Sequence, residues 1–141
     1  MKKFELTSET KINIFGKKLF RIKALVSFGV VKTGETGGWV EKEENVNQSG
    51  DAWVFGNAEV FGNARVFGNA DYATIHGFGT QFRTTTFFRC KDKQVKVSCG
   101  CFYGTIPEFR EQVKNTRKGK IAEEYLMIAD LMEKHFAEEA K

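Results

Sequence analysis

A six-residue repeat in the middle of the chain constrains its fold more than any other feature. From residue 50 the sequence reads GDAWVF, GNAEVF, GNARVF and GNADYA, so that Gly, Asn or Asp, and Ala recur at fixed positions. Ala and the Val two residues later lie on the same side of an extended strand. A helix would scatter these positions around its circumference, because six is not a multiple of 3.6. Gly followed by Asn or Asp tolerates unusual backbone angles and therefore predicts a corner between short strands.

This repeat resembles the hexapeptide-repeat family of left-handed parallel β-helices, in which three units form one triangular coil. The four clear units span residues 50–73, and apolar residues continue the spacing of six on both sides, at Val40, Val46, Phe82 and Phe88. We therefore expect a mainly β protein with a short left-handed parallel β-helix of about two to three coils over residues 38–88.

The flanking segments predict caps for the open ends of the coil, where backbone groups would otherwise be unpaired. Residues 1–37 predict an N-terminal hairpin cap with its turn at Gly16-Lys17-Lys18. Residues 89–141 predict a C-terminal cap for oligomerisation, formed by a hairpin with its turn at residues 91–94 and two helices. Thr105 and Glu108 match a capping box at the start of the first helix. So short a coil buries little surface, and we expect a homo-oligomer, either a dimer or a trimer.

The charge and the N-terminal sequence bear on the partners and the compartment. The 141 residues include 22 Lys and Arg against 18 Asp and Glu, a net charge of +4 that favours anionic ligands without indicating nucleic acid as a partner. We find neither a secretory start nor an apolar run long enough to cross a bilayer. The expectation is a cytoplasmic protein with reduced cysteines and no membrane partner.

His76 is the one candidate for catalysis near the repeat. Many hexapeptide-repeat proteins are acyltransferases, so the resemblance implies acetyl-coenzyme A as a possible cofactor and a histidine as the general base. About two to three coils are short for the pantetheine arm of that cofactor, and no paired carboxylate accompanies His76. We therefore expect a protein without a cofactor or a catalytic residue, and keep a small acyltransferase that uses His76 as the alternative.

Metal binding is not expected. Carbonic anhydrases of related shape hold zinc with three histidines, whereas this chain has only His76 and His135. The three cysteines, Cys90, Cys99 and Cys101, lack the paired spacing of zinc ligands.

Two arginines among phenylalanines predict a site for an anionic, nucleotide-like ligand. Arg83 and Arg89 would clamp a phosphate, while aromatic rings at Phe82, Phe88 or Trp53 would stack on a base. Phe55, Phe61 and Phe67 lie beside the corners of the coil and predict packing against caps or neighbouring subunits. Basic residues also cluster at Lys114, Arg117, Lys118 and Lys120, a pattern more often found on a solvated surface.

Beyond the repeat, most of the chain resembles small proteins of bacteriophage and prophage type. The segments that carry this resemblance are FELTSETKINIFGKKLFRIKAL, TGGWVE, the VFGNA units and VKVSCGCFYGTIPEF. The resemblance implies a phage context and no established activity. By analogy, we expect a non-enzymatic inhibitor of host anti-phage immunity in the host cytoplasm, which sequesters a nucleotide-derived signal or binds a host defence protein. A structural phage component is a further alternative.

Overall fold

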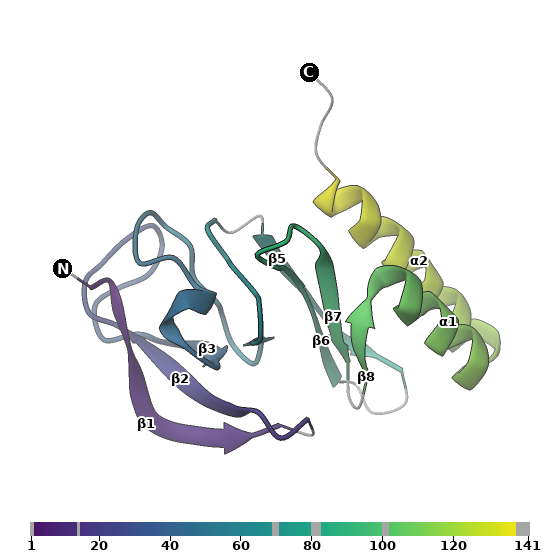
Figure 1. Cartoon of the computed structure of the whole chain (residues 1–141), viewed down its shortest axis with the longest axis horizontal. Helices are drawn as coiled ribbons and strands as arrows, with labels where there is room; N and C mark the ends of the chain where they lie inside the picture. The colour runs from purple at the N-terminus through teal and green to yellow at the C-terminus, as the bar shows by residue number, and fades with distance from the viewer. Residues whose placement is uncertain (1, 14, 69–70, 80–82, 100–101, 138–141) are drawn as a thin grey trace.

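Two four-stranded sheets and a pair of helices make up the computed structural model, which describes residues 2–13, 15–68, 71–79, 83–99 and 102–137. The sheets lie beside one another, and both helices cover the side of the second sheet that faces away from the first (Figure 1). In the first sheet the order is β1 (Phe4–Ile12), β2 (Lys18–Ala24), β3 (Thr36–Val40) and β4 (Glu59–Val60). The second sheet has the order β5 (Tyr72–Phe78), β6 (Arg83–Arg89), β7 (Val95–Cys99) and β8 (Phe102–Thr105), and is followed by α1 (Ile106–Thr116) and α2 (Gly119–Phe136).

The prediction of a left-handed parallel β-helix over residues 38–88 is wrong. Among the described residues, parallel pairing is confined to β3 with β4 and to one bridge between Val46 and Val66. Both join residues 20 apart, not the 18 of a three-unit coil. The chain then reverses, because β5 pairs antiparallel with β6 instead of stacking on the preceding units. Antiparallel pairs therefore dominate both sheets.

The repeat nevertheless forms the core that the first sheet covers. Ala and Val at the inward positions of the first three units are all at most 1% exposed. Gly37 and Gly38 let β3 pass close to this segment, since a Cβ atom on either residue would lie within 3 Å of Val54. A larger residue at these two positions would separate β3 from the repeat.

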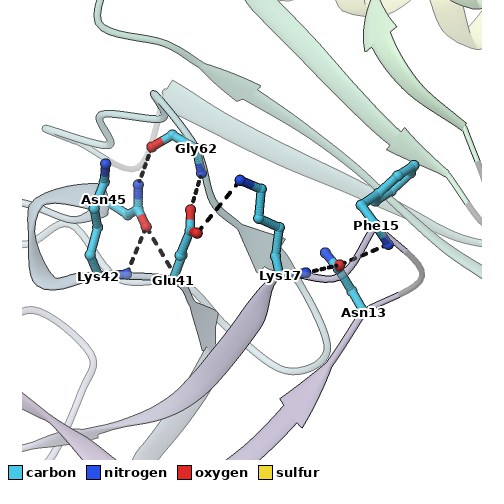
Figure 2. A network of polar contacts seen from close by, with 7 residues as sticks. All are labelled: Asn13, Phe15, Lys17, Glu41, Lys42, Asn45 and Gly62. Carbon is cyan, nitrogen blue, oxygen red and sulfur yellow. Dashed lines mark hydrogen bonds and ion pairs between the residues drawn. The ribbon is translucent and has the colours of Figure 1, made fainter.

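A buried amide fixes the turn after β3 to the repeat (Figure 2). Asn45 is fully buried in the short 3-10 helix η1 (Glu43–Asn45), and its Oδ1 atom accepts hydrogen bonds from the backbone N–H groups of Glu41 and Lys42. Its Nδ2 atom donates to the carbonyl oxygens of Gly62 and Ala64, at 3.2 and 3.1 Å. All polar atoms of this side chain are thus used within the fold.

The local predictions for the flanks are confirmed. β1 and β2 form the N-terminal hairpin, and β6 and β7 form the hairpin with its turn at residues 91–94. Thr105 accepts a hydrogen bond from the backbone N–H of Glu108, whose carboxylate accepts one from the backbone N–H of Thr105, which completes the capping box of α1.

Strand β6 contributes to two separate cores. Phe87 packs with the helices, together with Val97 and Phe109, whereas Phe88 packs on the opposite side of the strand with residues of the first sheet. Between the sheets, the backbone N–H of Glu59 also donates to the hydroxyl of Thr86, at 3.3 Å. The two halves of the chain are therefore joined by packing and by polar contacts.

Candidate functional site: the basic tip of the helical pair

The two arginines predicted to clamp a phosphate do not come together in the backbone. Arg83 and Arg89 stand at opposite ends of β6, and six residues of extended strand span roughly 20 Å. The side chain of Arg83 and the whole of Phe82 lie outside the described residues.

Arg89 is instead engaged within the fold. Its guanidinium lies 3.0 Å from the carboxylate of Asp71, donates a hydrogen bond to the carbonyl oxygen of Phe136, and lies over the ring of Phe136 at 5.4 Å. These contacts hold the end of α2 against the second sheet.

The aromatic rings predicted to stack on a ligand are enclosed in the first core. Trp53 and Phe88 are each 0% exposed. Trp53 lies between the rings of Phe4 and Phe28, at 6.0 and 5.4 Å, while Phe88 packs against Phe61 at 5.6 Å. Neither ring presents a face to solvent, so both rings pack inside the core and are not available to stack on a ligand.

His76 lies on an exposed part of β5. Its Nδ1 atom is 2.9 Å from the hydroxyl of Thr84, the residue directly opposite on β6. Both side chains stand on the face of the sheet away from the helices. The described residues therefore give His76 one hydroxyl partner.

The cysteines and histidines are dispersed in the structure. Within the described part of the chain, no group of three or more His, Cys, Asp or Glu residues is placed to hold a metal ion. Cys101 lies outside that part. Cys90 and Cys99 are free thiols, and the Sγ atom of Cys99 accepts a hydrogen bond from Thr85.

Burial makes Cys90 a poor nucleophile. Loss of solvation, with a smaller contribution from the nearby carboxylate of Asp92, raises the pKa of the Cys90 thiol from 9.0 to about 11. The thiolate, which is the reactive form, is therefore scarce at neutral pH.

The same shift predicts a loss of stability in alkali. Between the two pKa values the unfolded chain releases the Cys90 proton while the folded chain retains it, so the free energy of unfolding falls as the pH rises. We expect Cys90 to account for a fall of about 2 kcal/mol between pH 8.5 and 10.5. Urea unfolding of the wild type and Cys90→Ala across this range measures the difference, because the tyrosines titrate in both proteins. Equal pH slopes would contradict the assignment.

A concentration of unpaired positive charge lies where α1 meets α2. Arg117 and Lys118 are the two residues between the helices, Lys114 is in the last turn of α1, and Lys120 is in the first turn of α2. All four side chains are exposed, and none of them takes part in an ion pair with another described residue. We call these four residues the basic tip; in Figure 1 it lies at the end of the helical pair that points away from the first sheet.

The sequence around the basic tip opposes the stability of α2. A helix N-terminus carries a partial positive charge and is stabilised by acidic residues and by a capping side chain. In α2 the N-cap position is Lys118, which makes no side-chain capping bond, and the first turn has no acidic residue. Lys118 and Lys120 thus place two positive charges where the partial positive charge of the helix N-terminus favours negative ones.

This cluster was visible in the sequence and was interpreted as solvated surface. The missing information was which cations of the chain are paired with carboxylates in the fold. The absence of Asp and Glu from residues 112–122 was visible in the sequence and would have been a usable signal.

Comparison with known proteins adds no family to this description. The sequence matches no protein-family model and no curated protein. No helix in the described part of the chain, α1 and α2 included, is long and apolar enough to span a bilayer.

Proposed function

We propose that this chain is a non-enzymatic binding protein that holds a phosphate-bearing partner at the basic tip. The observation that carries the proposal is the set of four exposed cations within seven residues, with no acidic residue among residues 112–122. Charge that is not neutralised within the fold is available to an anionic partner. Its position at the start of α2, where it costs stability, supports a role outside folding.

A binding role is favoured over the acyltransferase alternative. That alternative depended on stacked coils along which acetyl-coenzyme A would lie, and the repeat does not form them. His76, its proposed base, is exposed and hydrogen-bonded to Thr84. The described surroundings of His76 thus offer no particular support for catalysis.

The biological target remains a prediction from the sequence. Inhibition of host anti-phage immunity, through a nucleotide signal or a host defence protein, rests on the phage resemblance. The homo-oligomer is also a prediction from the sequence, and it rests on the small surface that a short coil would bury. To these predictions the proposal adds the chemical class of the partner, a phosphate-bearing molecule, and the site that binds it, the basic tip.

Neutralising the tip tests this function. We expect the wild type to bind at least one phosphate-bearing probe among cyclic dinucleotides, ADP-ribose and a short DNA duplex, measured by calorimetry. A variant with Lys114, Arg117, Lys118 and Lys120 all changed to Gln should lose that binding, because the attracting charge is gone.

A control variant removes the same amount of charge elsewhere. Glutamine at four other exposed lysines, Lys23, Lys32, Lys91 and Lys134, should leave the binding intact. The proposal fails if no probe binds to the wild type, or if the two variants lose binding equally.

A further inference from the structure

We propose that the partner of the basic tip is the phosphodiester backbone of a nucleic acid, and not a single nucleotide. This inference rests on the proposed function and specifies its ligand. Residues 114–120 are all exposed and form the turn at the end of two helices (Figure 1). A single nucleotide needs a concave site that encloses most of its surface, whereas a polyanion is held by charge on an open surface.

A concave feature near the helices lies away from the basic tip and has no cation among its lining residues. A shallow depression of about 370 Å³ is bordered by the start of α1, at Ile106 and Pro107, and by Glu133 near the end of α2. It lies at the opposite end of the helical pair from the basic tip. Its one charged lining residue is Glu133, which is paired with Arg110, so no lining residue of the depression supplies a cation for a phosphate.

The distribution of charge distinguishes the tip from the rest of the surface. Several other cations are neutralised by carboxylates within the fold: Lys2, Lys11, Lys17, Arg21, Arg89 and Arg110. The net charge of +4 thus understates the local charge, because the tip alone carries four positive charges in seven residues. The sequence analysis weighed against nucleic acid on net charge, whereas binding to a polyanion depends on where the charge is placed.

The chemistry of the tip suits contacts with the backbone and not with the bases. Lysine and arginine side chains supply charge and hydrogen-bond donors to phosphate oxygens, and such contacts carry no sequence information. The exposed residues of the tip include no aromatic side chain on which a base would stack. We therefore expect binding without sequence preference.

The number of cations sets the expected salt dependence. Each neutralised phosphate releases counterions, so the logarithm of the binding constant falls with the logarithm of salt concentration by about 0.9 per contact for duplex DNA and about 0.7 for a single strand. With at most four contacts, the slopes should not be steeper than about −3.6 and −2.8, respectively.

The experiment compares four probes on the full chain. Fluorescence anisotropy would follow binding of a labelled duplex DNA of about 20 base pairs and a single-stranded RNA of equal length, each from 50 to 200 mM salt. Calorimetry would measure a cyclic dinucleotide, and co-sedimentation would measure vesicles of phosphatidylcholine with about 30% phosphatidylserine. We expect binding to at least one nucleic acid, with a slope of about −2 to −3.6 for duplex DNA or about −1.5 to −2.8 for single-stranded RNA; the duplex slope should become shallower by about 0.9 when Lys118 is changed to Gln.

Each other outcome has a distinct meaning. Binding of the cyclic dinucleotide at the tip without binding of either nucleic acid would overturn this inference and leave the proposed function standing. Binding to the vesicles alone would overturn it in favour of a membrane surface. Binding of none of the four probes would defeat both proposals. If nucleic acid binds equally well to the wild type, to Lys118→Gln and to the fourfold glutamine variant, the site lies elsewhere and the inference is overturned.

Discussion

Replacing Phe88 with alanine is expected to lower the free energy of unfolding by about 3–5 kcal/mol. The ring is 0% exposed, and its removal would leave a cavity between the two sheets. It would also remove aromatic contacts with Phe61, at 5.6 Å between ring centroids, and with Tyr103, at 6.3 Å. The loss should appear as a lower midpoint in urea unfolding.

Phe67 provides the matched control for this prediction. It belongs to the repeat but is 64% exposed, so Phe67→Ala should change the free energy of unfolding by less than about 0.5 kcal/mol. A cost of about 1 kcal/mol or less for Phe88→Ala would show that its ring is not enclosed. The stacking role predicted from the sequence would then deserve a new test.

Reversing the charge of Lys118 and Lys120 is expected to stabilise the protein while it removes binding. Lys118 already has the extended backbone that an N-cap requires, at φ −139° and ψ 159°, so Lys118→Asp supplies a capping side chain and contributes about 0.5–2 kcal/mol. Lys120→Glu places a negative charge in the first turn of α2 and contributes about 0.3–1 kcal/mol. The melting temperature should rise by about 2–4 °C for each kcal/mol.

Binding should change in the opposite direction. Each phosphate contact contributes roughly tenfold in affinity at 0.1 M salt, so loss of two cations weakens nucleic-acid binding by about 10²-fold, and the two new carboxylates add repulsion. Scanning calorimetry and anisotropy on the same preparation measure both effects.

A charge-matched pair separates local from global effects. Lys32→Glu with Lys91→Glu makes the same change in net charge at exposed positions outside α2, and should leave affinity within about threefold. A Lys118→Asp, Lys120→Glu variant that is more stable but binds normally would exclude the tip as the site. One that is no more stable would contradict the helix-dipole argument.

Local features of the fold were predictable from the sequence because their signals are local. The capping box at Thr105 and Glu108 and the alternation in both hairpins depend on residues a few positions apart. The corners of the repeat follow the same rule, since Gly50, Gly56 and Gly62 have positive φ angles, as corner glycines should.

The long-range arrangement was not predictable from this periodicity. A repeat of six specifies which side chains point inward, but it does not specify how the strands pair. The same pattern fits a continuous coil and also fits one parallel pairing followed by a reversal of the chain. Gly68 is not among the glycines with positive φ, so the fourth unit lacks the corner of the first three. The antiparallel strand β5 begins within this unit, at Tyr72, and the last parallel bridge lies in the third unit, at Val66.

The candidate site was misplaced for a related reason. The sequence predicted that Trp53 would stack on a ligand, but Phe4 of β1 and Phe28 cover its ring from a distant part of the chain. Arg89 is likewise engaged by Asp71 and by the end of α2. Spacing along a sequence gives the face of a strand, and only tertiary structure gives what covers that face.

The placement of Phe87 and Phe88 on opposite sides of β6 has a consequence for any event at the helices. Neighbouring residues of one strand anchor both hydrophobic interiors, so the backbone of β6 cannot shift without disturbing both. The helical pair is for this reason not a detachable module. Strain applied by a bound partner at its far end would reach the N-terminal sheet through β6, together with Tyr72 of β5 and Tyr103 of β8, which also pack on the first core.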